Sequence, residues 1–399
     1  MHIIETQKSI PVTDNFQVAV CGGGIAGISA ALSAARAGAK TILIENQYML
    51  GGLATAGLVT IYLPLCDGNG HQVSFGICEE LIRLSEKYGI DEPIPEAWKD
   101  PAATVEQRAK KRFLNRYHPN VFAIQCEQLL LEAGVEILYG TRVASVEKAG
   151  NKISHLILEN KSGRTAIGVN SVVDATGDAD VALQAGAPTA TFAHGNILAS
   201  WYYYIKDGKL GLKQLGFADK SDENGNYDSD SDTDRYYTGL DGKENSEMVI
   251  ASHKKLLEHF LQNGQLSHTY APVTVATVPQ VRMTRRIDTS LRLDISHDKQ
   301  EFHTSVGMIA NWRKTGPVYE IPFETMYAPE VPNLLCAGRN ISVTDAMWDI
   351  SRVIPGCAVT GEAAGLAAAM SDDMTALKIQ DLQEKLMQRN ISLHTGEVL

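Results

Sequence analysis

The pattern of apolar positions near the start of the chain predicts a strand, a helix and a second strand. Residues 17–21 are a short apolar run that leads into three glycines, and small residues then predominate from Ile25 to Ala37. Gly38 suits the end of that helix, because glycine tolerates the left-handed backbone found there. A second apolar strand is expected over residues 40–45. This order predicts the strand–helix–strand unit of a parallel sheet.

The same kind of pattern continues along the chain. Helices are expected at residues 77–88, 104–117 and 123–133, followed by a strand at 135–139. Residues 143–173 predict a three-stranded meander that crosses back to the main sheet, and its last strand runs to Thr176. Near the other end of the chain we expect a core strand at 333–338, a small-residue helix at 355–370 and a surface helix in the tail.

The composition changes between residues 188 and 329. The aromatic run Trp201–Tyr204 predicts a strand, and strand character returns over residues 273–294. Between them, residues 217–241 are polar and acidic, with Asp-Ser repeats, which is typical of a mobile surface insertion. We therefore expect a β-rich region here that differs from the rest of the chain.

Composition excludes some functions and favours others. The chain has 399 residues, 44% of them hydrophobic, and a formal net charge of -11, so a nucleic-acid surface is not expected. No apolar stretch is long enough to predict a membrane span, and the first residues do not read as a secretory signal. Six scattered cysteines fit reduced thiols better than a disulfide framework. We expect a cytoplasmic protein without membrane or nucleic-acid partners.

The glycine turn after the first strand has the spacing of a dinucleotide fingerprint. In Gly22-x-Gly24-x-x-Gly27, the first glycine permits a tight turn, the second permits close approach of a pyrophosphate, and the third lets the helix pack on the strand. The helix start offers free N–H groups to phosphates. Glu45 ends the second strand, where an acid can bind ribose hydroxyls. A chance glycine turn is the alternative, and the fingerprint by itself does not separate FAD from NAD.

Three further motifs carry a resemblance to a known family. They are the glycine segment at residues 51–57, the Asp-Ala-Thr-Gly-Asp segment at 174–178, and the paired C-terminal segments at 335–342 and 352–365. This ordered set resembles flavoproteins of the glutathione-reductase type and, more narrowly, FAD-dependent oxidoreductases. The resemblance covers almost the whole chain apart from residues 217–241. A second fingerprint and a C-x-x-x-x-C pair are missing, so a thiol-disulfide reductase is not expected.

The resemblance implies FAD as the cofactor and assigns residues to it. Adenine would lie near Val143, the pyrophosphate or ribityl chain near Gly338 and Arg339, and the flavin ring near the start of the helix at Pro355. Arg339 departs from the acidic residue of many related disulfide reductases, so their ribityl contacts are not carried over. The complete set of expected cofactor-binding residues is Gly22, Gly24, Ile25, Ala26, Gly27, Glu45, Asn46, Gly51, Gly52, Leu53, Ala54, Thr55, Val143, Ala175, Thr176, Gly177, Asp178, Gly338, Arg339, Pro355, Gly356 and Cys357.

The fold class that follows is α/β, or α+β overall. We expect a Rossmann-like, three-layer FAD-binding domain with an interposed β-rich substrate domain. The FAD-binding domain would take residues 1–187, with a helical excursion at 68–120, and residues 330–399. The substrate domain would take residues 188–329. A homodimer is compatible with the resemblance, although no residue pattern requires it.

Four residues are candidates for the chemistry. Arg282 and Arg286, in a dense basic cluster with Arg285, would share one side of a strand and could bind a carboxylate, phosphate or polyol. Ion pairing with nearby acids or a contact within an oligomer is the alternative for this cluster. Arg352 precedes the flavin-facing helix, and His194 could be an acid–base group or simply a structural hydrogen-bonding residue. Metal-ligand spacing is not found in the sequence.

The expected reaction is hydride transfer between a small polar metabolite, anionic or a polyol, and the flavin. The electron acceptor is left open. Two other functions remain: an NAD(P)-dependent oxidoreductase that uses the same fingerprint, and an electron-relay flavoprotein within a larger complex. A flavin-free protein that binds nicotinamide nucleotides would favour the first alternative. Stable FAD that no small donor reduces, together with a redox partner that co-purifies, would favour the second.

Overall fold

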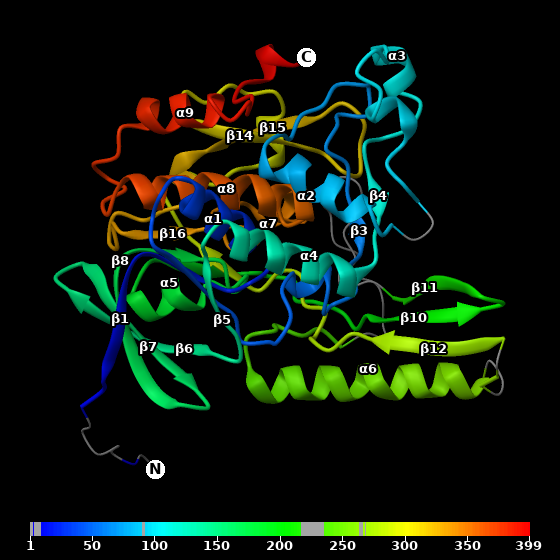
Figure 1. The fold of residues 1–399 in the computed structure, drawn as a ribbon, viewed down its shortest axis with the longest axis horizontal. Coiled ribbons are helices and arrows are strands. Elements are labelled where there is room, and N and C mark those ends of the chain that lie inside the picture. The colour runs from blue at the N-terminus through cyan, green and yellow to red at the C-terminus, as the bar shows by residue number, and fades with distance from the viewer. Residues whose placement is uncertain (1–2, 4–8, 90–91, 217–234, 263–265, 268) are drawn as a thin grey trace.

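A computed structural model describes residue 3 and residues 9–89, 92–216, 235–262, 266–267 and 269–399. Figure 1 shows a main body with helices above a twisted sheet and a separate strand-and-helix arm on the right. The helices are α1 (Ile25–Arg36), α2 (Ile77–Glu86), α3 (Val105–Arg108), α4 (Pro119–Glu132), α5 (Asp180–Ala185), α6 (Gly242–Gln262), α7 (Asp345–Ser351), α8 (Ile354–Met370) and α9 (Ile379–Met387).

A seven-stranded sheet lies at the centre of the main body. Its strands run in the order β5 (Glu136–Leu138), β2 (Thr41–Ile44), β1 (Val12–Cys21), β8 (Gly163–Asp174), β7 (Lys152–Asn160) and β6 (Arg142–Ala149), and β16 (Leu334–Cys336) also pairs with β8. The pairs β1–β2, β2–β5, β1–β8 and β8–β16 are parallel. The α/β fold class and the strand–helix–strand unit predicted from the sequence are confirmed.

The long strand β8 explains how the sheet holds both parallel and antiparallel pairs. Residues 163–168 of β8 pair antiparallel with β7, whereas residues 172–174 pair parallel with β16. The meander β6–β7–β8 predicted for residues 143–173 is therefore confirmed, and its last strand enters the parallel sheet. As a result, β16 from the end of the chain reaches the centre of the sheet, beside the return from β8.

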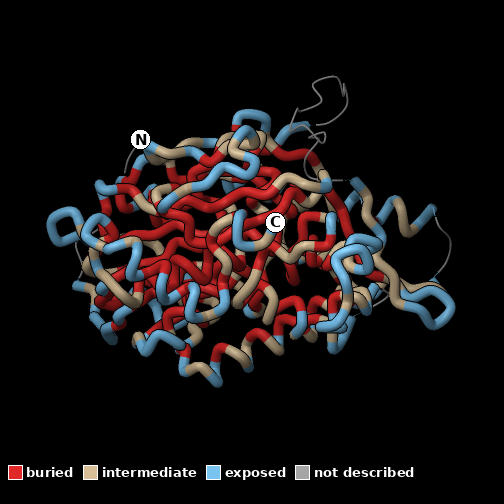
Figure 2. Tube along the Cα trace, turned by 90° about the horizontal axis from the view of Figure 1, so that it is seen from above, coloured by how far each residue is buried: buried red, intermediate tan, exposed pale blue. Residues whose placement is uncertain are grey.

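Side chains of β1 alternate between two hydrophobic clusters. Val18 and Val20 pack with α1 and α8 on one face, and Ala19 and Cys21 pack with α5 and the meander on the other. Figure 2 shows this buried interior as a continuous band enclosed by exposed loops. The arrangement gives three layers, with the sheet in the middle.

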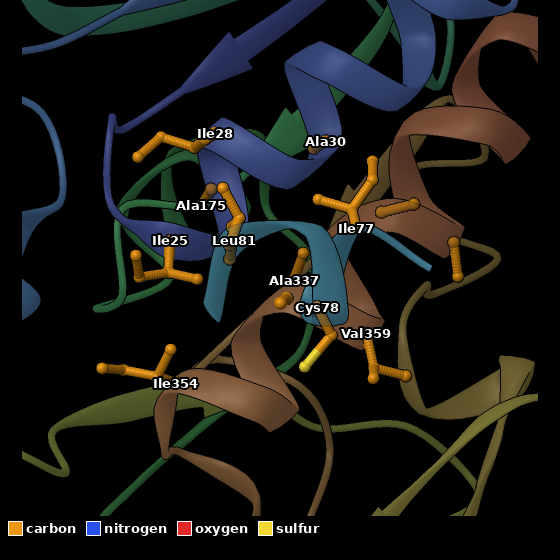
Figure 3. Close-up of a cluster of buried hydrophobic side chains, with 14 of the residues drawn as sticks. Ile25, Ile28, Ala30, Ile77, Cys78, Leu81, Ala175, Ala337, Ile354 and Val359 are labelled. Atoms are coloured by element: carbon orange, nitrogen blue, oxygen red, sulfur yellow. The ribbon is translucent and has the colours of Figure 1, made fainter. Parts of the chain in front are cut away.

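Helices α1 and α8 are adjacent and are built mainly from small residues. A Cβ at Gly361 would lie 2.3 Å from the Ala26 carbonyl oxygen, and one at Gly365 would lie 2.0 Å from that of Ala30. The two backbones therefore come together as closely as glycine permits. Figure 3 shows side chains of α1, α2 and α8 gathered beside this contact, among them Ile28, Ile77 and Val359.

The arm contains a small antiparallel sheet covered by α6. Its strands run in the order β11 (Lys209–Leu215), β10 (Ser200–Lys206) and β12 (Tyr270–Val275). The strand predicted at the aromatic run Trp201–Tyr204 is confirmed, whereas the 21-residue α6 was not predicted. Three short antiparallel pairs complete the described strands: β3 (Ile61–Tyr62) with β4 (Asn115–Arg116), β9 (Thr189–Thr191) with β13 (Arg285–Ile287), and β14 (Ser305–Ala310) with β15 (Val318–Pro322).

Two predicted segments differ from the structure. The helix expected over residues 104–117 is wrong: a capping box at Thr104 starts only the single turn α3, and Phe113 is instead buried in a stack on Trp98. Of the predicted mobile insertion at 217–241, residues 217–234 lie outside the described part. The remainder is attached, because Tyr237 is buried and exchanges two 2.7 Å backbone hydrogen bonds with Asn196.

None of the described helices is by itself long and apolar enough to cross a membrane. The bent pair α7 and α8 reaches that length and apolar character only when the two helices are taken together, and they meet at 88°. Both helices are largely buried within the protein.

Candidate functional site

The three fingerprint glycines are needed for different reasons. Gly22 has a φ of 103°, and a Cβ there would lie 2.5 Å from the Ala175 carbonyl oxygen. At Gly27 a Cβ would lie 1.8 Å from the Gly22 carbonyl oxygen, so this glycine lets α1 pack on the turn. At Gly24 a Cβ would meet no protein atom within 4 Å. Gly24 thus faces open space, as a backbone that receives a ligand would.

The N-terminus of α1 opens onto a cavity of about 590 Å³, a volume typical of ligand pockets. Gly24 is the N-cap, and no side chain caps the helix. Gly24, Ile25 and Ala26 all line the cavity. Because the first N–H groups of a helix lack partners within it and carry partial positive charge, this start fits a phosphate group.

Glu45 lies directly after β2 and connects two loops. Its Oε2 accepts a 2.6 Å hydrogen bond from the Gly23 N–H, and its Oε1 accepts one of 2.6 Å from the Gln47 N–H. The side chain also lines the cavity, and burial raises its pKa. Each carboxylate oxygen keeps a second lone pair, so the predicted role on ribose hydroxyls fits the geometry.

The second glycine segment joins the first. The Gly51 N–H donates to the Gly23 carbonyl at 2.7 Å, and Gly51 and Gly24 form a parallel bridge. Gly52, Leu53 and Ala54 then line the cavity. Thr55 is not a lining residue: it is buried and its hydroxyl donates to the Leu50 carbonyl. Thr55 fixes the turn rather than presenting a group to the cavity.

The return segment after β8 is organised by the buried carboxylate of Asp174. It accepts hydrogen bonds from the Thr176 N–H and hydroxyl, the Ala182 N–H and the Asn340 amide. This network holds the segment 175–178 against both the start of α5 and the turn after β16. Gly338 reaches the cavity from that turn, and its N–H donates to the Thr360 hydroxyl at 2.9 Å.

One cavity therefore brings together most of the residues expected to bind the cofactor. Those that line it are Gly22, Gly24, Ile25, Ala26, Glu45, Asn46, Gly51, Gly52, Leu53, Ala54, Val143, Ala175, Thr176, Gly177, Asp178, Gly338, Arg339 and Cys357. The expected residues outside the lining are Gly27, Thr55, Pro355 and Gly356. Gly356 has a packing role, since a Cβ there would lie 2.0 Å from the Ser351 carbonyl oxygen.

The start of α8 forms another part of the cavity wall. Val353 is the N-cap, and Val353, Ile354 and Cys357 line the cavity. Burial raises the pKa of Cys357 to about 11, although the positive charges of Arg339 and Arg352 act in the opposite direction. The Cys357 thiol donates to the Arg352 carbonyl at 3.2 Å. It is thus a protonated, packed side chain at neutral pH.

The candidate arginines separate into different surroundings. Arg282 and Arg352 both line the cavity. The strand predicted to carry the cluster is only β13, Arg285–Ile287, so Arg282 lies outside it. Arg286 is not among the lining residues: it forms a 3.0 Å ion pair with Asp288, and its guanidinium lies 5.7 Å from the Trp348 ring centre. The predicted common face of Arg282 and Arg286 is therefore wrong.

His194 lies outside the cavity lining. Its imidazole is half-exposed, 4.0 Å from the Asp345 carboxylate, and packs edge-on against the Phe192 ring. These surroundings agree with the structural alternative given for His194. The acid–base role of His194 stays a prediction.

Several residues of the cavity wall were not predicted from the sequence. Val59, Ile61 and Leu63 come from the segment after the second glycine motif, and Val278, Pro279 and Val281 come from the middle region. Arg142 and Gln184 add polar groups. These residues share no local motif. Their only signal is proximity in the chain to a motif residue, as for Arg142 beside Val143.

The glycine turns, the acid after β2 and the shared cavity are the features of a dinucleotide-binding protein. A family model described as FAD dependent oxidoreductase matches residues 17–200 and 223–390. Since this is well over half of the chain, the protein belongs to the family of FAD-dependent oxidoreductases. It is an FAD-dependent enzyme, as the resemblance implied.

Solved structures provide weaker likenesses. A geranylgeranyl bacteriochlorophyll reductase-like protein from Thermoplasma acidophilum is 15% identical, with 94% of this chain and 82% of that chain covered and a TM-score of 0.47. The p-nitrophenol 4-monooxygenase of Pseudomonas putida is 11% identical, with 94% and 84% covered and a TM-score of 0.49. Likenesses of this size give no indication of reaction or substrate.

Proposed function

We propose that the enzyme transfers a hydride between FAD and a small anionic or polyol metabolite, within the cavity described above. Bound FAD supplies the redox chemistry, and the chain's own residues position the two reactants. The observation that carries the proposal is that Arg282 and Arg352 line the same cavity as the glycine turns. A guanidinium is well suited to a carboxylate, because its N–H groups match the two oxygens.

Different groups of the protein would bind different parts of the cofactor. Backbone N–H groups at the start of α1 would hold the pyrophosphate, and Glu45 would hold the ribose. Val353 and Ile354 place the start of α8 at the cavity, where its partial positive charge favours a more negative flavin. The apolar lining at Val59, Ile61 and Val281 would limit access of water.

We also place this family within the glutathione-reductase type of flavoproteins. The ordered glycine motifs support that placement, as does the antiparallel meander β6–β7–β8 that crosses back to the parallel sheet. Residues 188–329 would be the substrate domain, because this region contributes Arg282, Val278 and Val281 to the cavity. A cytoplasmic location and a homodimer remain part of the same proposal.

The test begins with an absorbance spectrum and analysis of the released cofactor. The FAD-bound enzyme is then mixed without oxygen with hydroxy acids, amino acids, polyols and reduced nicotinamides, and bleaching of the flavin is followed. Reduction by one small donor, slowed about tenfold or more in Arg282→Met, is the expected result. Arg164→Met, on the meander and outside the cavity lining, is the matched control.

Other outcomes would identify the alternatives. A colourless protein that takes up no added FAD would refute the placement of the cofactor. Stable FAD that is photoreduced, but is not reduced by any small donor, would indicate electron relay. Reduction by a donor at equal rates in wild type and Arg282→Met would leave hydride transfer standing and remove the arginine from substrate binding.

A further inference from the structure

We propose that Asp349 is a positioning residue that holds Arg352 at the cavity wall, so that the charge of Arg352 acts on an anion bound beside the flavin. The inference rests on the proposed placement of FAD in the cavity. Asp349 is not itself a lining residue. It would therefore act through Arg352, not by touching the reactants.

Arg352 has little freedom to move. It follows α7 as the C-cap and precedes the start of α8 by two residues. Its side chain is 9% exposed, and its Nη2 donates to Asp349 Oδ1. A buried guanidinium is costly unless it is paired and hydrogen-bonded, so the pair with Asp349 favours this position of the charge.

Asp349 is itself held by a second element. Its side chain is 1% exposed, and its Oδ2 accepts a hydrogen bond from Arg313 Nε. Its backbone carbonyl accepts a 2.9 Å hydrogen bond from Trp312 Nε1. The Arg313 guanidinium lies 4.2 Å from the Trp312 ring centre. The loop between β14 and β15 thus binds both the side chain and the backbone of Asp349.

That loop is fixed in turn by a distant part of the chain. Arg112 donates 2.6 Å hydrogen bonds to the carbonyls of Trp312 and Lys314. Asn311 Oδ1 accepts from the N–H groups of Arg313 and Lys314 at 2.9 Å each. A chain of contacts therefore runs from Arg112 through this loop to Asp349, and from there to the cavity.

The charges of this cluster determine whether a change at Asp349 should weaken or strengthen anion binding. Arg313 and Arg352 both pair with the Asp349 carboxylate, close to the start of α8. If Asp349 positions Arg352, a neutral side chain at 349 releases the guanidinium and weakens anion binding. If Asp349 only offsets positive charge, the same change strengthens anion binding. The tight packing of Asp349 against Trp312 and Arg313 favours positioning.

The experiment is a double-mutant cycle on the FAD-bound enzyme, with sulfite as the anion. Sulfite binding to the flavin is followed by bleaching of the visible band, which needs no substrate. We expect Arg352→Gln to weaken sulfite binding about tenfold or more, and Asp349→Asn to weaken it by about threefold or more. The double variant should bind sulfite no more weakly than Arg352→Gln, because Asp349 acts through Arg352. Asp14→Asn, which removes an exposed carboxylate paired with Lys40, is the matched control.

Two results would overturn the proposal: tighter sulfite binding by Asp349→Asn, or losses that add in the double variant. If Asp349→Asn does not fold, Arg313→Gln replaces it, because it removes the outer anchor and leaves the Asp349–Arg352 pair. It should weaken sulfite binding in the wild-type background and leave the Arg352→Gln background unchanged. A wild-type protein without FAD would refute the placement of the cofactor, whereas normal FAD with no effect of Asp349 refutes only the positioning role.

Discussion

At the scale of single residues, Gly24 and Gly27 have different roles, one in ligand binding and the other in folding. Gly24 borders the cavity, and the space that a side chain would take there is open. At Gly27 the Gly22 carbonyl occupies the space that a side chain would need. The same type of residue therefore serves the cofactor at one position and the backbone packing at the other. Sequence spacing alone does not distinguish these roles.

Gly24→Ala should weaken FAD binding by about tenfold or more and leave the free energy of unfolding of the FAD-free protein nearly unchanged, because the new methyl group meets no protein atom. Gly27→Ala should lower that free energy by about 1–3 kcal/mol or more, because its methyl group would overlap the Gly22 carbonyl. Flavin fluorescence measures the first effect and urea denaturation the second. Equal FAD affinity of Gly24→Ala and wild type would contradict the assignment.

At the scale of elements, the contact between α1 and α8 determines how closely the two helices approach. Gly361 and Gly365 are one helical turn apart and meet the carbonyls of Ala26 and Ala30. Larger residues would hold the helices apart, and the starts of both helices would then separate at the cavity. Packing at this contact thus sets the dimensions of the site.

Gly365→Ala should therefore destabilise the protein by about 1–3 kcal/mol or more and also weaken FAD binding. The cause is the 2.0 Å approach of its Cβ to the Ala30 carbonyl oxygen. The control is Gly396→Ala, since a Cβ at Gly396 meets nothing within 4 Å. Thermal unfolding with and without FAD measures both effects. A Gly365→Ala protein as stable as the Gly396→Ala control would show that the helices can move apart freely.

For the molecule as a whole, Glu362 connects elements from both ends of the chain. It lies in α8, its Oε2 accepts a 2.7 Å hydrogen bond from the Ile77 N–H at the start of α2, and Arg389 lies 3.7 Å from its Oε1. Burial raises the pKa of Glu362 from 4.5 to about 7. Folding thus favours the protonated carboxyl, and this contribution is complete below pH 4.5 and is lost as the pH rises to about 7.

Glu362→Gln should reduce the dependence of stability on pH, because the amide resembles the protonated acid in every condition. Between pH 5 and pH 8, the free energy of unfolding of wild type should fall relative to the variant, by at most roughly 3 kcal/mol. Denaturant unfolding at the two pH values provides the measurement. If the free energy of unfolding had the same pH dependence in the two proteins, the titrating group would not be Glu362.

The sequence predicted the parts of the molecule that depend on local pattern. The unit from β1 to β2 and the meander were readable because their apolar runs and turns are contiguous. Helix α6 was missed because it follows an acidic segment and carries several polar residues, and the helix expected near Phe113 was wrong because tertiary burial replaced local propensity. Within the site, glycine motifs were visible, whereas Val281 and Ile61 reach the cavity only through tertiary folding.

The position of β16 beside β8 also has a consequence for how the enzyme is made. The segment that follows residue 333, from β16 to α8, supplies Gly338, Arg339, Arg352 and Cys357 to a cavity whose other wall is formed by the first glycine turn. During synthesis the ribosome releases the first wall long before the second. A nascent chain can therefore contain its early strand–helix–strand unit while one wall of the cavity is still missing, so the complete cofactor site is assembled only after the segment that follows residue 333 has emerged.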